Sequence, residues 1–527
     1  MANTVTTLKT RFNNAEQFKE SFSEDSPTIS YVFIGNHLAY PNESVPSDIE
    51  DTIRDEKNVW SNMIGGKKIT GNDVEHVVSR INWTANTKYK QYDDRTNYES
   101  LLTSNTSLNT KPMYVITTNR NVYMCLSNNT SANSTIEPTG DYSTSNGVID
   151  TADGYRWKYL YNIKPSNKFI TEDWIPVPTS NIQLDYTVNS LGIVDGELTT
   201  IVVTNGGSGY KHSNVNVVSF ISGTNILQIS NTTIVLNEFN IPSLSNLTNM
   251  SVSGQGIRPA TFISSVNVAS GLLTLSSETN GTGGNTVPLS LTSRVAIQGD
   301  GTRAEGRVFL NGSGNVANIK VTTVGIGYSF ANAVVYGSGS GAETRVILSP
   351  KYGFAYNPAK QLGAKNIMVS VRVGEIDSTE GGLISSNTNF RQYGILRDPH
   401  KYGQTSVVSS ANSAAAISQT TDLNLVAGAN YQQNEFVYQG ALSNPSAYGY
   451  IVEEDIAQGV VKLSGVRGTM VTGLNLLGAN SLVQRTVVSV KNPEFQPFSG
   501  DILHVENVTA IDREDGQAED IKFVLKF

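Results

Sequence analysis

The feature that most restricts the fold of this chain is an internal repeat of short apolar stretches punctuated by glycine. ELTTIVVTNGGSGY aligns with NVANIKVTTVGIGY, and the copies share two glycines and a tyrosine: Gly207, Gly209 and Tyr210 in the first, Gly325, Gly327 and Tyr328 in the second. Further along, GDGTRAEGRVFL at 299–310 resembles GSGSGAETRVIL at 337–348. Glycine permits tight turns, and we expect the tyrosine to pin each turn to its sheet. The pattern therefore predicts a repeated β unit.

The composition extends this expectation to the whole chain. Charged residues make up 16% of the 527 residues, below the roughly 25% that is usual in soluble domains. Asn, Ser, Thr and 46 Gly take their place, and these residues favour strands and turns over helices. A chain of this length is too long for one core and should divide into several domains. We therefore predict a mainly β protein of the β-rich α+β class.

Charge and cysteine content exclude several classes of function. The formal net charge is −8 and no basic run occurs, so we expect no general binding to nucleic acid. The one cysteine, Cys125, excludes a disulfide framework, and its apolar surroundings favour a packing role over a reactive thiol. No apolar stretch reaches the roughly 18–20 residues of a membrane span, and the N-terminus lacks the apolar core of a signal peptide. We therefore expect no membrane insertion, and synthesis in a cytoplasm.

Residues 1 to about 190 contain all four tryptophans and the clearest helix signal. We interpret VPSDIEDTIRDEKNVWSNMIGG as one helix that begins with a capping box of Ser47 and Glu50 and ends at Gly65 and Gly66. Apolar residues recur along it at helical spacing, namely Ile49, Ile53, Trp60 and Ile64. This apolar stripe should lie on a sheet.

Two segments indicate that sheet. PMYVITTNRNVYMCLS contains two apolar strands around a polar turn, and GYRWKYLYNI alternates aromatic and polar residues. In the second segment the residues from Tyr155 to Ile163 at every other position are aromatic or apolar, and Arg156, Lys158 and Asn162 lie between them. Such alternation predicts a strand. We interpret the aromatic face as core and not as a ligand site.

No group of residues indicates a reaction. The five histidines lack the spacing of metal ligands: His37, His76, His212, His400 and His504. GGKKIT and GSGSGA lack the context of phosphate or dinucleotide loops, and DREDGQAED does not match the ligand pattern of a calcium loop. Carboxylates such as Glu453, Glu454 and Asp455 leave a glycosidase pair open, but the sequence does not pair them. We therefore assign no catalytic, cofactor-binding or metal-binding residues and predict that the protein is not an enzyme.

Five segments taken together resemble the baseplate wedge subunit encoded by gene eight in T4-like contractile phages. They are VWSNMIGGKKITGNDVEHVVSRINW, STIEPTGDYSTSNGVIDTADGYRWKYLYNIKP, WIPVP, FRQYGILRDP and ILHVENVTAIDREDGQAEDIKFVLKF, in the same order along the chain. The resemblance covers roughly residues 1–190, 351–430 and 491–527, and the glycine-rich regions depart from it. It implies a layered β-sandwich core with helix-bearing loops, a homodimer that contacts other baseplate wedge proteins, and no catalysis.

These observations together predict a division into four parts. They are an N-terminal wedge-type β-sandwich domain at 1–194, a glycine-rich β repeat at 195–350 with an inserted β module at about 222–298, a second part of the wedge-type core at 351–430 and 491–527, and an inserted small β module at 431–490. The predicted function is that of a structural subunit of the virion, in the tail baseplate, assembled in the host cytoplasm. A carbohydrate-binding tail protein is the main alternative, and a polysaccharide-degrading tail enzyme is a third.

Overall fold

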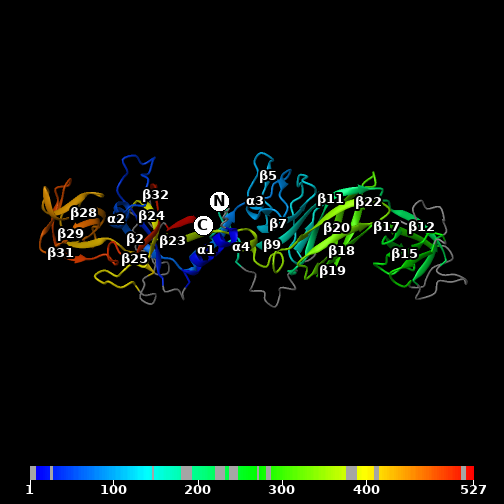
Figure 1. The fold of residues 1–527 in the computed structure, drawn as a ribbon. Coiled ribbons are helices and arrows are strands. Elements are labelled where there is room, and N and C mark those ends of the chain that lie inside the picture. Colours follow the sequence, from blue (N-terminus) through cyan, green and yellow to red (C-terminus); the bar gives the residue numbers. More distant parts are fainter. Residues whose placement is uncertain are drawn as a thin grey trace, which may run out of the picture. The chain divides into compact units, whose positions relative to one another are not determined.

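The computed structural model shows a mainly β protein, as predicted, with 48% of residues in strands and 9% in helices (Figure 1). It describes residues 7–23, 28–144, 147–179, 193–219, 232–236, 247–269, 272–279, 287–374, 388–408, 415–511 and 518–527. The chain divides into unit 1, which comprises Met1–Val78, Lys168–Val177 and Ala364–Phe527, and unit 2, which comprises Ser79–Asn167 and Pro178–Gly363. The range 1–194, which the sequence assigned to one domain, is therefore divided between the two units.

Unit 1 contains a β-sandwich of two antiparallel sheets. The first sheet has the order β25-β2-β1-β24-β32 (Ala416–Ser418, Met63–Lys68, Ser30–Gly35, Phe390–Arg397, Asp501–Ile511). The second has the order β10-β3-β23-β33 (Trp174–Pro176, Val74–Ser79, Asn366–Gly374, Ala518–Lys526). Val32 and Ile34 of β1 share one core with Val369 and Val371 of β23 and with Phe523 of β33. Burying alternate residues of facing strands in this way is what joins two sheets into a sandwich.

The predicted helix is shorter than its sequence pattern indicated. Helix α2 covers Ile53–Asn62 and is capped by Thr52, whose Oγ1 accepts a hydrogen bond from the Asp55 amide (3.1 Å). The capping box at Ser47 and Glu50 is therefore wrong. The helix ends early because the residues from Met63 onward pair with β1. A Cβ at Gly66 would lie 2.7 Å from the Val32 carbonyl oxygen, so this glycine permits close strand approach and does not end a helix.

The apolar face of α2 does lie on a sheet, as predicted. Val59 and Trp60 are buried and share a core cluster with Tyr31 and Phe33 of β1 and with Leu396 of β24. Ile53, which the predicted stripe included, is 73% exposed at the first helical position. The shorter helix therefore buries only the second half of the predicted stripe.

Helix α1 (Leu8–Glu20) closes the sandwich near β3. The Phe12 ring stacks on the His76 ring with centroids 5.0 Å apart, and His76 Nδ1 lies 2.8 Å from the Ala364 carbonyl oxygen. The His76 side chain has no exposed surface. Burial lowers its pKa from 6.5 to about 4, because a charged imidazolium would lose its hydration there, and Lys19 nearby also disfavours the charge.

Unit 1 should therefore lose stability as the pH falls. The unfolded chain binds a proton at His76 near pH 6.5 and the folded chain only near pH 4, so stability falls between these values by on the order of 3 kcal/mol. The substitution His76→Leu should remove this pH-dependent contribution to the free energy of unfolding. Urea unfolding followed by tryptophan fluorescence at pH 7 and pH 4.5 measures it, with His212→Leu as the control because His212 is exposed. An unchanged pH dependence in His76→Leu would assign the acid sensitivity to another group.

A closed barrel forms the remaining part of unit 1. Its strands have the order β26-β29-β28-β27-β30-β31 (Thr421–Leu425, Val460–Gly468, Asn444–Asp455, Phe436–Ala441, Asn475–Gly478, Gln484–Lys491). It has its own core, which includes Leu423, Val437, Ile451 and Leu463. The predicted module at 431–490 corresponds to this barrel, which in the structure begins at β26.

Unit 2 contains a four-stranded antiparallel sheet that includes both strand segments identified in the sequence. Its order is β6-β7-β9-β8 (Tyr114–Ile116, Asn121–Asn128, Tyr155–Asn162, Val148–Asp150). β6 and β7 form the predicted hairpin, with Tyr114 opposite Met124 and Arg120 at positive φ (60°) in the turn. Smaller elements complete this region: the parallel pair β4 and β5 (Lys88–Tyr89, Thr110–Lys111), α3 (Tyr98–Leu102) and α4 (Pro358–Gln361).

The glycine repeat forms a six-stranded sheet in which the two copies are interleaved. The order is β21-β18-β19-β20-β11-β22 (Ala331–Tyr336, Arg294–Gly299, Thr302–Leu310, Val316–Ile326, Leu198–Ser208, Ser340–Leu348). β11 and β20, the aligned strands, are antiparallel neighbours, with Ile201 opposite Ile319. β11 pairs on its other side with β22 of the second copy, and β20 pairs with β19 of the first. The predicted repeat therefore has an approximate two-fold relation.

The repeated glycines and tyrosines occupy matching positions. Gly207 and Gly325 have φ of 61° and 65°, and a Cβ on Gly207 would lie 2.4 Å from the Ser340 carbonyl oxygen. Tyr210 and Tyr328 are both buried in the core of this sheet. Their rings lie against the glycines that precede β22 and β19, where a Cβ at 337 or 301 would meet them within 3 Å. The tyrosines thus pin the turns as predicted.

One copy of the repeat carries a second sheet as an insertion. Its order is β14-β17-β12-β13-β16-β15 (Ser251–Gly254, Val287–Thr292, Ser213–Ser219, Thr233–Leu236, Leu272–Leu275, Ile263–Asn267). It lies between β11 and β18 in the sequence, where the second copy passes from β20 to β21 through a short turn. Among the described residues, Ile234, Leu273, Leu289 and Leu291 form a separate core. The inserted sheet begins earlier, at β12, than the predicted boundary near 222.

Substituting the repeated glycines should destabilise unit 2. Gly207→Ala and Gly325→Ala each place a side chain at positive φ, which costs roughly 1–2 kcal/mol, and add the close approach to a neighbouring strand. We expect both variants to lower the melting temperature measured by differential scanning calorimetry. Gly312→Ala is the matched control, because a Cβ there meets no atom within 4 Å. Equal melting temperatures for all three variants would contradict the assigned role.

Candidate functional site

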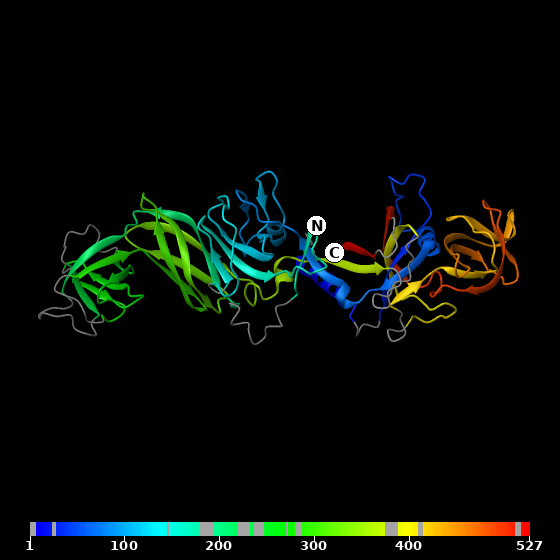
Figure 2. The same ribbon diagram turned by 180° about the vertical axis from the view of Figure 1, so that it is seen from behind.

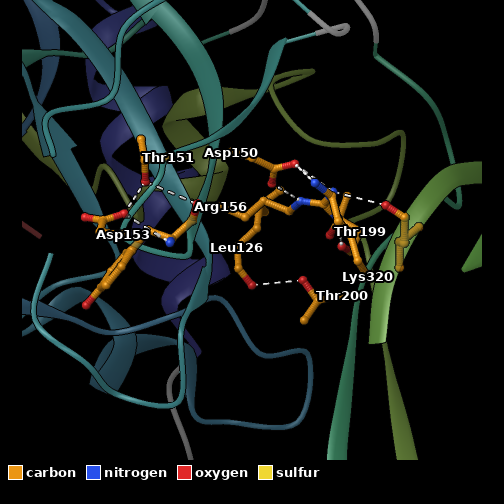
Figure 3. Close-up of polar contacts among 10 residues, drawn as sticks. Leu126, Asp150, Thr151, Asp153, Arg156, Thr199, Thr200 and Lys320 are labelled. Carbon is orange, nitrogen blue, oxygen red and sulfur yellow. Dashed lines mark hydrogen bonds and ion pairs between the residues drawn. The ribbon is translucent and has the colours of Figure 1, made fainter. Parts of the chain in front are cut away.

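A polar cavity between two sheets of unit 2 brings several charged groups together. Its volume is about 180 Å³, and residues of β7, β8, β9, β11 and β20 line it. The charged lining residues are Asp150, Arg156 and Lys320, and the uncharged polar ones include Thr151, Thr199 and Asn318. Figure 3 shows Asp150 and Arg156 of one sheet facing Thr199 and Lys320 of the other.

Arg156 is the centre of this cluster. Its Nε donates to Asp150 Oδ1 (2.8 Å), its Nη1 to the Thr199 carbonyl (2.9 Å) and its Nη2 to the Val321 carbonyl (3.0 Å). One guanidinium from the four-stranded sheet thus binds two adjacent strands of the six-stranded sheet (Figure 3). Arginine suits this role because its planar group presents several donors in fixed directions.

Asp150 completes the charge balance. Lys320 Nζ lies 2.8 Å from Asp150 Oδ2, so two cations share this carboxylate. Burial alone would raise the pKa of Asp150, but hydrogen bonds from Arg156 and Lys320 outweigh it and hold the pKa below its usual value. A second polar contact across the same boundary joins Thr200 Oγ1 to the Leu126 carbonyl (2.9 Å). The Asp150 carboxylate is therefore ionised at neutral pH and paired with Arg156 and Lys320.

A fully buried ion pair lies deeper between the same two sheets. Lys158 of β9 and Glu197, which precedes β11, have side chains 0% and 1% exposed, and Nζ lies 3.4 Å from Oε1. Glu197 Oε1 also accepts a hydrogen bond from the Phe354 amide (3.4 Å). Burial raises the pKa of Glu197 although Lys158 opposes the shift. Such a pair is costly to separate, because either charge alone would remain unpaired in the core.

Sequence reasoning missed this pair. The alternation of GYRWKYLYNI placed Lys158 on the polar face of its strand, but both faces of β9 are covered and Lys158 is buried. Leu160 on the same face was the available signal, since an apolar residue between two polar ones indicates cover on that side. Nothing in the sequence identified Glu197 as its partner.

The charged groups of this cavity are bonded to one another and to backbone carbonyls. Asp150 is occupied by two cations, and Arg156 donates to three acceptors. Among the residues that line the cavity there is neither a histidine nor a cysteine, and the Thr151 hydroxyl donates to the neighbouring Asp153 carboxylate. The arrangement joins two sheets.

The structure places the other residues that the sequence singled out in separate environments. Cys125 is buried, and burial raises the pKa of its thiol well above the usual value. His37 is buried against Asn434 and Ser464, at 2.7 Å and 2.6 Å, and His504 lies 2.8 Å from Glu506. Over the described part of the chain, no three His, Cys, Asp or Glu residues gather as metal ligands.

The carboxylates considered for a glycosidase pair are engaged in two ion pairs and one hydrogen bond. Glu453 Oε2 lies 2.8 Å from Lys462 Nζ, Glu454 pairs with the buried Arg485, and Asp455 accepts from the Gln458 amide (3.0 Å). GGKKIT begins inside β2 and GSGSGA leads into β22, so neither forms a phosphate loop. Most of DREDGQAED lies outside the described residues.

A ladder of four aromatic side chains lies on the outer face of the barrel. Phe436 and Tyr438 of β27 stand opposite Tyr450 and Tyr448 of β28, with the Phe436 ring 5.3–6.1 Å from the other three. All four side chains are half-buried. Phe436 is the centre of a continuous aromatic surface, which offers ring faces to a partner.

The buried ion pair gives a direct test of how the two sheets are joined. Lys158→Met should destabilise unit 2 by about 3–5 kcal/mol, because it leaves Glu197 buried without its cation. Since burial raises the pKa of Glu197, protonation should restore part of that stability as the pH is lowered. Guanidinium unfolding at pH 7.5 and pH 5 measures both effects.

Two further variants complete that test. Lys158→Met combined with Glu197→Gln should recover much of the loss, because no unpaired charge remains. Lys320→Met is the matched control, since Lys320 is 48% exposed and should cost little. A Lys158→Met protein as stable as the wild type would show that the pair does not hold the sheets together.

No protein-family model matches this chain, and no curated protein matches it. Within the part of the chain that the structure describes, no helix has the length and apolar character needed to cross a bilayer.

Proposed function

We propose that this protein is a structural subunit of a phage tail baseplate wedge, which connects neighbouring wedge proteins during assembly and contraction of the tail. The observation that carries the proposal is where the resembling segments lie. Four of the five segments supply elements of the sandwich: 59–83 supplies part of α2 with β2 and β3, 174–178 supplies β10, 390–399 supplies β24, and 502–527 supplies most of β32 and all of β33. The fifth, 134–165, supplies β8 and β9 of unit 2. Segments far apart in the sequence thus meet in one sandwich.

The regions that depart from the resemblance support the proposal in a second way. The barrel, the interleaved repeat and the inserted sheet each have a hydrophobic core of their own. They are additions that leave the strand order of the sandwich uninterrupted. An insertion that returns the chain close to its starting point costs the host fold little.

The polar chemistry of the chain also suits a scaffold. The charged residues of unit 2 pair with one another and tie sheets together, and the Lys158–Glu197 pair is fully buried. A virion protein that transmits movement needs stiff domains and defined contacts and needs no reaction centre. The proposed assembly is a homodimer in the tail baseplate of the virion, in contact with other wedge proteins.

A carbohydrate-binding tail protein is the second candidate, and the aromatic ladder of the barrel favours it. Phe436, Tyr438, Tyr448 and Tyr450 present adjacent rings on one face, and sugar rings stack on such faces through their C–H groups. A wedge protein would use the same surface against another protein, because aromatic residues supply much of the energy of protein interfaces.

Light scattering on the purified chain, alone and with candidate wedge proteins from the same genome, tests the proposal. We expect a stable dimer that forms a complex with at least one of them. A chain that binds none of them, while Tyr448→Ala abolishes binding to host polysaccharide, would favour the carbohydrate-binding alternative. A phage particle that assembles a contractile baseplate without this chain would contradict the wedge function.

A further inference from the structure

Strand β33 is a long strand at the edge of the second sheet of the sandwich, and no described strand pairs with its outer side. The edge strands β25 and β10 have three residues each, too few to template much pairing. β32 is longer, but Asn507 donates to the Ser47 carbonyl (2.7 Å) and the Ala510 amide bonds the Glu43 carboxylate, so a loop covers its edge. β33, with nine residues, pairs only with β23 among the described strands. No strand lies along its outer side in Figures 1 and 2.

The direction of the free backbone groups of β33 follows from its pairing. The Phe527 amide donates to the Lys365 carbonyl, next to the pair of Lys526 with Asn366. Because N–H and C=O groups of an antiparallel strand point to alternate sides, the odd-numbered residues bond to β23. The even-numbered ones, at 520, 522, 524 and 526, direct theirs to the open edge. An unpaired row of this kind can accept another strand.

The two faces of β33 carry different kinds of side chain. Ile521 and Phe523 are 6% and 4% exposed and belong to the sandwich core. On the opposite face, Asp520 and Lys526 are exposed. A partner strand has to place its own apolar residues on the core side, so odd-numbered residues must oppose odd-numbered ones.

Charge then selects one arrangement of two copies of this strand. With Phe523 on the two-fold axis, Glu519–Phe527 of one copy pairs with the same residues of the other, and Asp520 of each copy lies opposite Lys526 of the other. A slip by two residues in one sense places Lys522 opposite Lys522, and in the other sense Lys522 opposite Lys526. Like charges directly opposite each other destabilise a strand pair, and larger slips leave much of β33 unpaired.

We propose that a second copy of this chain pairs antiparallel with the outer edge of β33, about a two-fold axis at Phe523. The two second sheets of the sandwiches then form one continuous sheet, with reciprocal ion pairs between Asp520 and Lys526. This inference rests on the homodimer in the proposed function and assigns its surface.

Charge reversal in the full-length chain tests this register. Asp520→Lys and Lys526→Asp each place like charges opposite each other twice, so each should raise the dimer dissociation constant at least 10-fold at low salt, measured by analytical ultracentrifugation. A mixture of the two variants restores both ion pairs, and native mass spectrometry should show the mixed dimer in preference to either homodimer. Glu305→Lys is the control for Asp520→Lys, because it makes the same charge change at an exposed position of unit 2.

A backbone variant tests the edge itself. Val524→Pro removes an amide that points to the open edge and leaves the bonds of odd-numbered residues to β23 in place, so it should weaken the dimer while the monomer stays folded by circular dichroism. A dimer unaffected by all three substitutions would overturn this surface and leave the proposed homodimer standing. A chain that stays monomeric at every concentration would overturn both, while binding to wedge proteins remains a separate measurement.

Discussion

The pairing of β3 with β23 is the constraint on which the organisation of this protein depends. Val77 stands opposite Asn366 in that pair, so the chain leaves the sandwich and returns to it on adjacent strands. Apart from the short segment Lys168–Val177, unit 2 is the connection between these two strands. The sandwich is therefore completed only after the whole of unit 2 has been synthesised, because β23, β24, β32 and β33 all follow it. Such long-range pairing slows folding.

Charged residues are scarce in this chain, and several of them join separate sheets inside unit 2, as Arg156 and Lys158 do. An interface between two sheets built only from apolar residues would hold equally tightly but would tolerate sliding. The carbonyl groups of Thr199 and Val321 accept from one guanidinium only in one alignment, so the polar contacts fix the register of the two sheets.

How much of this was predictable depends on the range of the interaction concerned. The hairpin of β6 and β7 and the glycine repeat are encoded by residues close in sequence, and both predictions are confirmed. The predicted helix was too long at its C-terminal end because the residues from Met63 to Gly66 pair with β1, which begins 33 residues before Met63 at Ser30. Local helical spacing carries no information about that competitor. The partner of Lys158 was hidden for the same reason, since only the packing of two sheets brings Glu197 to it. The interleaving of the repeat copies also needed three dimensions, because the alignment shows that two copies exist and not which strands pair.

Interleaving makes the two copies of the repeat mechanically inseparable. β11 and β20 each take a neighbour from the opposite copy, so neither copy has a complete hydrogen-bonded sheet when the other is absent. Fraying that begins at one end cannot stop at the boundary between copies, because no such boundary exists in the sheet. The six-stranded sheet should therefore unfold under mechanical load as one cooperative unit, whereas independent repeats would unfold one after another.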